Sequence, residues 1–485
     1  MSGGRSVGRG PGPGPGHDSS ERSTRYRFGP RERGGTLAGW RTGQIVTVAV
    51  GLVFGVLVLR WEPNAAGVAA AMAVLVVYGA LATVPIAGRT SEEWVPVVVC
   101  WGTRRSGVGG RRMGALRSLR LVGAGWQDMG VVHDRSARTL TAVLALRGAS
   151  FALLGPDEQD RRVGAWASLL ASLAREGSPV HRVQWVAASF ADEGHGARAY
   201  LHAEAPVALV SANGGPTPAA TASYEGLLAD MDAHACAHDV VLALQVRLTK
   251  SLEAGCATLA REVGSVVRLL GDADVTVESI LGVDGIARLM VRTYEAGAER
   301  DGVVVAGGAG AGLTVQDPWP MAMEERWSSL RVDGMVHATF WVAEWPRVEV
   351  RSDFLAPLLL GTARSSFSVV MAPLGPDAAI RKVEASRTAD LADSELRRRG
   401  GFVSTARHAR ESEVLAQREA ELAEGHASFR FAGFVTVSAP DDKALEAACD
   451  VVQHAAGQSR LLLRRLYGDQ ASAYTCTLPL CRGLS

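Results

Sequence analysis

Two uncharged stretches near the start of this 485-residue chain decide its architecture: Thr42–Leu59, TGQIVTVAVGLVFGVLVL, and Ala65–Gly88, AAGVAAAMAVLVVYGALATVPIAG. At about 1.5 Å per residue, the first stretch would make a helix about 27 Å long, close to the hydrocarbon thickness of a bilayer. Arg60-Trp-Glu-Pro-Asn64 separates the two stretches with charges and a proline. Because lipid forces each span to satisfy its own backbone hydrogen bonds, the pattern predicts a transmembrane helical hairpin. A pair of buried core helices is the alternative, and such helices seldom lack charge over this length.

Arginine residues gather on the outer sides of the two stretches, and the connecting turn holds only Arg60. The positive-inside rule therefore places both termini in the cytoplasm of a two-span plasma-membrane protein. Tryptophan and arginine at span ends are the residues expected at the membrane interface. This reasoning selects Trp40, Trp61, Trp94, Arg41, Arg89, Arg104 and Arg105.

The segment that follows the hairpin mixes the apolar residues 95–101 with arginines at 104, 105, 111 and 112. One interpretation is a juxtamembrane surface that pairs with anionic lipid headgroups. The other is an ordinary linker whose arginines stop translocation. The sequence leaves both open.

Composition narrows the class of protein further. The chain has 51 basic and 50 acidic residues, a net charge of +1, which argues against nucleic-acid binding through bulk charge. Only three of the basic residues are lysines: Lys250, Lys382 and Lys443. The six cysteines form no CxxC motif, so reduced thiols in a cytoplasmic compartment are expected.

Five regions are predicted, in an α+β class with mixed α/β cytoplasmic domains built from βαβ units. Residues 1–35 form a Gly/Pro/Arg-rich tail too poor in apolar residues to order. The hairpin region covers 36–95, with spans of about 42–59 and 65–88, and a basic juxtamembrane linker covers 96–125. A first α+β domain covers 126–315 and a second covers 330–485. The clearest βαβ candidate has strands at 428–438 and 460–467 around a helix at 444–456, and no exact repeat of fixed period is visible.

No motif in the sequence points to catalysis or to a cofactor, and we expect a non-enzyme. Gly307-Gly-Ala-Gly-Ala-Gly312 lacks the lysine of a phosphate loop, because Leu313 holds that position, and is interpreted as an inter-domain turn. His234-Ala-Cys-Ala-His238 is a weak metal candidate, since on a helix His234 and His238 would share a face with Asp230 near Cys236. Histidines near a helix end also suit the negative helix terminus, and this structural explanation is favoured, so no metal site is predicted.

Several short motifs resemble those of secretion proteins. The first part, Arg25-Tyr-Arg-Phe-Gly-Pro30 with the two spans and Gly88-Arg-Thr-Ser-Glu-Glu-Trp94, resembles actinobacterial conjugation-type membrane proteins, whose hairpin is similar to the PrgI-like subunit of type IV secretion systems. The last part resembles the N-terminal, non-ATPase domain of CagE/TrbE-class conjugation ATPases. The motifs that carry this second resemblance are Trp341-Val-Ala-Glu-Trp-Pro346, Arg418-Glu-Ala-Glu-Leu-Ala-Glu-Gly-His426, Tyr467-Gly-Asp-Gln470 and Leu478-Pro-Leu-Cys-Arg-Gly-Leu484.

The resemblance implies a non-catalytic inner-membrane structural subunit, a platform for a separately encoded ATPase. In the ATPase class a Leu-Pro-Leu-Gly-like segment precedes the motor domain, and this sequence stops at Ser485, where the motor would begin. The implied partners are a secretion ATPase, other membrane subunits of an oligomeric complex and the bilayer, with anionic lipid contact. An EccE-like component of type VII secretion, or a membrane-anchored enzyme or sensor, are the alternatives.

Overall fold

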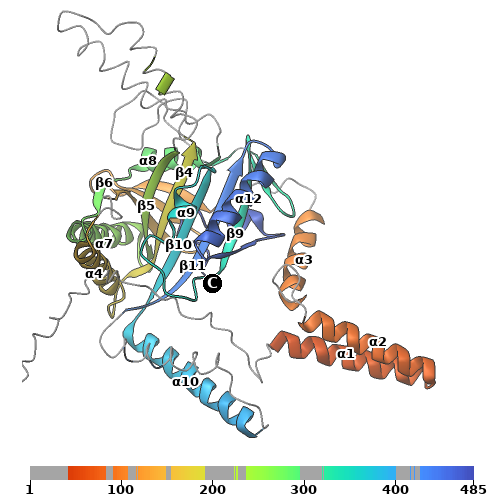
Figure 1. Ribbon diagram of the computed structural model, residues 1–485. Helices are drawn as coiled ribbons and strands as arrows, with labels where there is room; N and C mark the ends of the chain where they lie inside the picture. Colours follow the sequence, from red (N-terminus) through yellow and green to blue (C-terminus); the bar gives the residue numbers. More distant parts are fainter. Residues whose placement is uncertain are drawn as a thin grey trace, which may run out of the picture.

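The computed structural model describes residues 42–83, 91–106, 118–148, 154–191, 236–294, 322–399 and 427–484, with a few isolated residues between these ranges. Three helices come first: α1 (Thr42–Trp61), α2 (Ala65–Thr83) and α3 (Ser91–Ser106). The α1–α2 hairpin projects away from the rest of the molecule, and α3 lies between the hairpin and a large body (Figure 1). The predicted tail, residues 1–35, lies outside the described residues.

The body is built on a 12-stranded sheet whose main path has the order β1-β2-β3-β5-β4-β10-β11-β9-β8-β7. Two further strands extend from this path, β6 beside β3 and β12 beside β9. The strands are β1 (Leu119–Gly123), β2 (Gly130–Asp134), β3 (Thr139–Arg147), β4 (Val180–Ala191), β5 (Cys236–Arg247), β6 (Thr276–Ile280), β7 (Met323–Glu325), β8 (Leu330–Val332), β9 (Met335–Glu344), β10 (Ser365–Leu374), β11 (Ser428–Ala439) and β12 (Leu462–Arg465).

Helices cover both faces of the sheet because alternate strand residues are apolar on each side. On one face, β3, β5 and β4 pack against α4 (Pro156–Leu173) and α7 (Leu252–Asp272). On the same face, β9, β10 and β11 pack against α9 (Ala356–Leu359) and α12 (Asp442–Gln458), and Trp185 contacts both cores. The opposite face packs against α8 (Val283–Tyr294), α13 (Gln470–Tyr474) and the following segment.

The sheet consists of two halves with the same topology. Adding six to each strand label of the first half, β1-β2-β3-β5-β4, gives the second half in reverse order, and β6 beside β3 matches β12 beside β9. The halves meet at the antiparallel β4–β10 pair, where Val186 is opposite Ser368. Equivalent helices cover one face, α7 after β5 and α12 after β11 (Figure 1). The body is therefore an internal pseudo-dimer about an axis through the β4–β10 pair.

The two halves also share local sequence and capping. Leu252-Glu-Ala-Gly-Cys256 in α7 corresponds to Leu445-Glu-Ala-Ala-Cys449 in α12, and both cysteines are buried. Each helix ends in a left-handed residue, Asp274 (φ 59°) or Arg460 (φ 57°). The next residue, Val275 or Leu461, donates its amide back into the last turn, the pattern of a Schellman cap. No fixed period is visible in the sequence because the connecting segments of the two halves differ in length.

Two predictions need correction. The predicted βαβ unit is split: β11 and β12 both pair with β9 in antiparallel fashion, so β9 lies between them, and every described strand pair is antiparallel. The sequence of residues 276–296 predicts a helix, but within the described part of this stretch the structure has β6 followed by α8. Two predicted regions have the following counterparts in the structure. The stretch predicted as a linker, 96–125, is helical up to Ser106 and contains β1. The strands of the predicted domains, 126–315 and 330–485, belong to one sheet.

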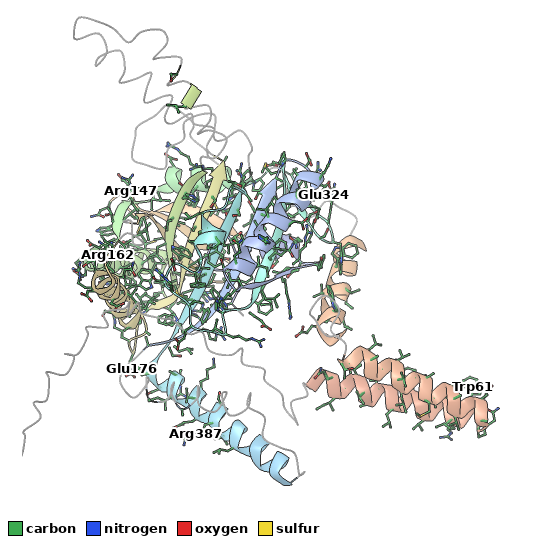
Figure 2. All side chains as sticks on the ribbon, viewed as in Figure 1. Trp61, Arg147, Arg162, Glu176, Glu324 and Arg387 are labelled. Carbon is green, nitrogen blue, oxygen red and sulfur yellow. The ribbon has the colours of Figure 1, made fainter. Side chains whose placement is uncertain are left out.

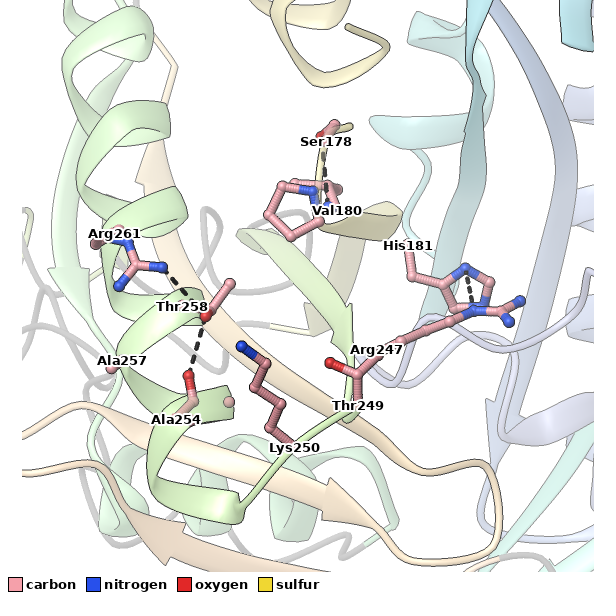
Figure 3. Close-up of a pocket in the computed structure, with 12 residues that line it drawn as sticks. Ser178, Val180, His181, Arg247, Thr249, Lys250, Ala254, Ala257, Thr258 and Arg261 are labelled. Atoms are coloured by element: carbon pink, nitrogen blue, oxygen red, sulfur yellow. Dashed lines mark hydrogen bonds between the residues drawn. The ribbon is translucent and has the colours of Figure 1, made fainter. Parts of the chain in front are cut away.

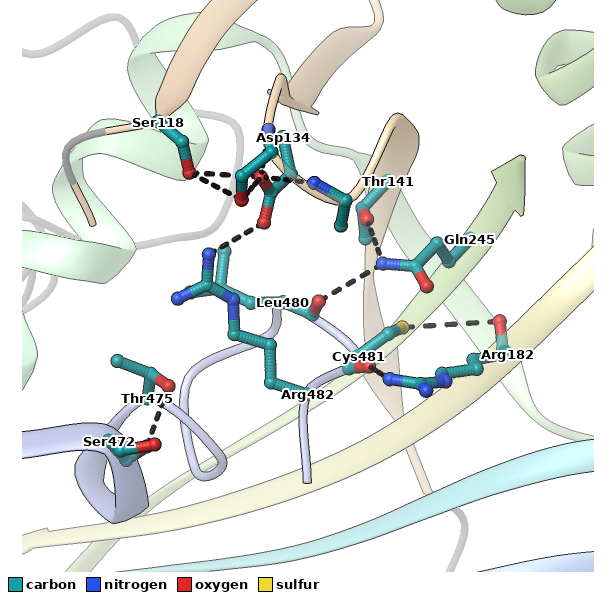
Figure 4. Close-up of polar contacts among 12 residues, drawn as sticks. Ser118, Asp134, Thr141, Arg182, Gln245, Ser472, Thr475, Leu480, Cys481 and Arg482 are labelled. Carbon is teal, nitrogen blue, oxygen red and sulfur yellow. Dashed lines mark hydrogen bonds and ion pairs between the residues drawn. The ribbon is translucent and has the colours of Figure 1, made fainter. Parts of the chain in front are cut away.

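A band of buried polar side chains crosses the sheet and holds the segment after α13 (Figure 4). Gln184, which is fully buried, donates to the Cys476 carbonyl (2.8 Å) and to Ser368 Oγ (2.7 Å), and accepts from the Cys481 amide (2.6 Å). Gln245 donates to Thr141 Oγ1 (3.1 Å) and to the Leu480 carbonyl (3.2 Å). These bonds satisfy both the buried side chains and an irregular backbone that has no strand partner.

Charged groups fix the same segment at its far end. Arg182 donates to the carbonyls of Cys481 and Leu484, and Arg482 forms an ion pair with Asp134 (2.6 Å). Burial alone would raise the pKa of Asp134, but hydrogen bonds from Arg482, Ser136 and the Ala137 amide hold that pKa well below its usual range. Asp134 is therefore a carboxylate at all ordinary pH values, and the pair stays charged.

Replacing Gln184 should destabilise the body strongly. The Gln184→Leu variant leaves the Cys481 amide buried without an acceptor, and we expect a loss of about 2–4 kcal/mol in the free energy of unfolding. Denaturation in detergent micelles, followed by tryptophan fluorescence, measures this loss. Ser366→Ala, at the equivalent position on β10, is the control and should change stability by less than about 0.5 kcal/mol. Equal stability of Gln184→Leu and wild type would contradict the role of the polar band.

Acid should weaken the body through His337 on β9. Its ring is fully buried, with Nδ1 2.8 Å from Ser438 Oγ, and burial together with Arg364 lowers its pKa from 6.5 to about 3. The unfolded chain binds a proton at this histidine below pH 6.5 and the folded chain does not, so His337 alone should lower stability by about 2 kcal/mol between pH 7 and pH 5. His337→Gln should reduce the total pH-dependent loss by about this amount, leaving the contribution of His181, whose pKa is also lowered, whereas the exposed His454→Gln should leave the loss unchanged. Denaturation curves at the two pH values make the comparison.

Candidate functional site: the apolar hairpin, its junction with the body and a basic cavity

The two hairpin helices are apolar on all sides and long enough to cross a membrane, Gly43–Trp61 and Ala65–Thr83. Large apolar side chains such as Val53 (57% exposed) and Val76 (66% exposed) point away from the protein. A water-soluble protein rarely exposes so continuous an apolar surface. Trp61, 89% exposed, lies at the tip of the hairpin farthest from the body (Figure 2).

Small residues allow the two helices to approach closely. A Cβ added at Gly51 would lie 2.5 Å from the Tyr78 Cβ, and Gly55 lies against Ala71 and Leu75. Gln44 Nε2 donates to the Ala82 carbonyl (2.9 Å), which pairs the open ends of the hairpin. Close backbone approach over small residues is typical of helix pairs in lipid, where tight packing replaces the hydrophobic effect.

An aromatic cluster fastens α3 to the body. Trp94 stacks on Trp327 with ring centroids 5.7 Å apart, and Trp101 meets the same ring edge-on at 5.2 Å. Tyr467 stacks on Trp327 at 6.4 Å and lies tilted beside Trp94 at 6.3 Å. Gly468 gives the space for this contact, since a Cβ there would lie 2.6 Å from Trp327 and 2.8 Å from Val97. The α3 residues 94, 97 and 101 share one helix face. Val95 and Val99, on the other side of the helix, are exposed, and so is Val98 at the edge of the contact face.

The predicted interface residues have different places in the structure. Trp61 is at the hairpin tip and Trp94 is in the aromatic cluster, so Trp94 contacts protein on at least one side. Arg104 and Arg105 lie in the last turn of α3, and their side chains are not described. Trp40, Arg41 and Arg89 lie outside the described residues. Contact of any of these residues with lipid remains a prediction.

The candidate metal ligands were expected on a helix, and this expectation is wrong for Cys236 and His238. Cys236 and His238 lie on strand β5, where alternate residues share a face, and His234 lies outside the described residues. The His238 ring has Nδ1 3.1 Å from Ser189 Oγ, and burial lowers its pKa. Within the described part of the chain, no three His, Cys, Asp or Glu residues are grouped as metal ligands.

Of the described cysteines, Cys256, Cys449, Cys476 and Cys481 are buried free thiols. Burial raises the pKa of Cys449 to about 11 and that of Cys476 to about 12. These thiols therefore stay protonated at neutral pH and act as core residues.

A cavity of about 770 Å³ opens between the start of β4, the end of β5 and the first half of α7 (Figure 3). Arg247, Lys250 and Arg261 line it together with hydroxyl groups such as Thr258. Arg247 Nε donates to His181 Nδ1 (3.2 Å), and Arg261 donates to Thr258 Oγ1 (3.2 Å). Burial, followed by the charges of Arg247, Arg182 and Arg430, lowers the pKa of His181 to about 4. The imidazole is therefore neutral, with its proton on Nε2.

No protein-family model matches this chain, and no curated protein matches it.

Sequence reasoning missed two parts of this site. Trp327 and Tyr467 are far from α3 along the chain, and no local pattern joins them to Trp94. The cavity cations come from the end of β5 (Arg247), the loop before α7 (Lys250) and α7 itself (Arg261). Two sequence features could have drawn attention to these parts. Lys250 is one of only three lysines in the chain, and Gly468, directly after Tyr467, leaves the space that Trp327 occupies.

Removing the central ring of the aromatic cluster should release α3. The Trp327→Ala variant loses the contacts to Trp94 and Trp101, which are each worth about 0.5–1.5 kcal/mol beyond buried area. We expect trypsin to cleave at Arg104 and Arg105 about tenfold faster, because cleavage follows the population of the open form. Trp126→Ala, which removes a ring packed near α7, is the control and should leave this cleavage rate unchanged. An unchanged rate in Trp327→Ala would show that the cluster does not hold α3.

Proposed function

We propose that the chain is a two-span membrane protein with a cytoplasmic body, acting as a non-catalytic structural subunit of a conjugation or type IV-like secretion apparatus. In this role the body is the platform for a separately encoded ATPase and for other membrane subunits. The observation that carries the proposal is the junction at α3, a helix that follows the apolar hairpin and stacks directly on the body through Trp94 and Trp101.

This junction supports a platform because it would fix the body relative to the membrane. A body on a flexible tether would move freely, and a rigid aromatic contact limits that freedom. The helices α1 and α2 both have contacts with α3. The hairpin, α3 and body therefore form a continuous packed chain of elements from the apolar helices to the sheet.

The proposed partner, a separately encoded ATPase, is inferred from the resemblance to the non-ATPase domain of conjugation ATPases. Two of the motifs that carry it have structural roles here: Tyr467-Gly-Asp-Gln470 forms the receiving side of the α3 junction, and Leu478–Leu484 is the segment held by the polar band. The Trp341–Pro346 motif ends β9, where β12 pairs. Each of these three motifs thus takes part in a contact between separate elements of the structure.

Copurification tests the proposal. Full-length protein, extracted with detergent from the membrane fraction, should copurify with a hexameric conjugation ATPase from the same cells. A tagged two-span membrane protein of unrelated sequence is the control for detergent artefacts. Recovery with an FtsK-type motor instead would favour the EccE-like alternative. ATP turnover by the isolated protein, or its recovery in the soluble fraction without detergent, would overturn the proposal.

A further inference from the structure

We propose that the cavity beside α7 binds the phosphate group of a small phosphorylated molecule. The site is formed by Arg247, Lys250 and Arg261, with His181 and Thr258 as neutral hydrogen-bonding groups. It belongs to the body alone, so it does not depend on the membrane role proposed above.

The charge of the cavity is the first reason. Three cationic side chains line it, and no aspartate or glutamate is among its lining residues in the described structure. Arg247 and Arg261 donate to neutral partners, an imidazole nitrogen and a hydroxyl, so neither charge is compensated by these bonds. The three side chains are exposed to solvent, so their mutual repulsion is screened, and a bound anion would gain charge-assisted hydrogen bonds from the cations that it reaches.

His181, which lines the cavity, lies in the same positive electrostatic potential. Two of the causes that lower its pKa to about 4 are the neighbouring charges of Arg247 and Arg182, after the larger effect of burial. Because Nδ1 accepts from Arg247, the neutral ring carries its hydrogen on Nε2, which is available as a donor. The imidazole therefore remains a neutral donor at physiological pH.

The second half of the body keeps only one of these three cations. Lys250 lies two residues before the Leu-Glu-Ala-x-Cys segment of α7, and Lys443 lies two residues before that of α12. Arg261, five residues after Cys256, corresponds to His454, and Arg247 corresponds to Pro440. Asp441 and Asp442 stand at the start of α12, which removes the excess of positive charge there.

In the second half, apolar side chains occupy the place that corresponds to the cavity. Residues Leu355, Leu358 and Leu359 around α9 pack in one core with α12, and Leu358 is buried. In the first half α4 lies farther along α7, as the ion pairs Arg175–Glu262 (3.3 Å) and Arg162–Asp274 (2.6 Å) show. The start of α7 is left open. One half thus keeps a closed apolar contact where the other keeps an open basic cavity.

The size of the cavity indicates a ligand larger than an inorganic ion. Its volume of about 770 Å³ falls in the range of pockets that hold small molecules, about 300–1,000 Å³. Guanidinium and ammonium groups beside hydroxyls match a phosphate in charge and in hydrogen-bond donors. The geometry therefore points to a phosphorylated small molecule whose phosphate contacts the basic wall.

Calorimetric titration of inorganic pyrophosphate into the full chain in detergent micelles tests the site. Wild type should show saturable binding with one site per chain, and Lys250→Gln should weaken it about tenfold, the effect of losing one charge-assisted contact. Lys443→Gln, the matched lysine of the second half, should bind within about twofold of wild type. Lys250→Arg should keep most of the affinity because it keeps the charge.

Two further measurements make the outcome decisive. Melting curves of each variant check that it is folded, and Arg247→Gln replaces Lys250→Gln if that variant is unstable. Sulfate at the same ionic strength separates specific binding from screening. Absence of saturable binding, equal weakening in Lys443→Gln, or equal heats with sulfate and pyrophosphate would each overturn the proposal.

Discussion

A buried polar band governs the arrangement of the body. Gln184 and Gln245 lie on neighbouring strands in the middle of the sheet, on a face that would otherwise be apolar. Buried amides need partners, and here the partners are backbone groups of the segment around Cys476 and Cys481. The backbone of this segment in turn has no strand to pair with. The buried glutamines and the segment's backbone therefore satisfy each other's hydrogen bonds, and these bonds fix where the segment crosses the two halves of the sheet.

The sequence predicts local elements of this fold much better than their partners. Alternating apolar residues identify β3, β9 and β10, and the acids after Pro156 mark the start of α4 correctly. Strand β6 is lost because its five residues lie between two helices and share their composition. The pairing of β9 with both β11 and β12 joins residues about a hundred positions apart. Local sequence patterns do not show such pairing, so they predicted that β11 and β12 form a βαβ unit, whereas β9 lies between them.

The candidate site was predictable only where a single segment carries it. The uncharged stretches identify the hairpin because length and composition suffice. The α3 junction is different: Trp94 fits a membrane belt as well as an aromatic cluster, and only the fold brings Trp327 and Tyr467 to it. The basic cavity is likewise assembled from three segments. The internal duplication was hidden because little sequence is shared beyond the Leu-Glu-Ala-x-Cys segments, although each half keeps the same caps and strand order.

The β4–β10 pair also has a consequence for the order of folding. Within the first half, β3, β4 and β5 pair over shorter stretches of chain than the distance from Val186 to Ser368. Closing a longer loop costs more entropy, so each half gains its own contacts before the two halves join. Until then β4 and β10 are open edges that carry Trp185 and Phe367, and such edges attract other chains. The molecule is thus most vulnerable to aggregation late in folding, when both halves exist but have not yet met.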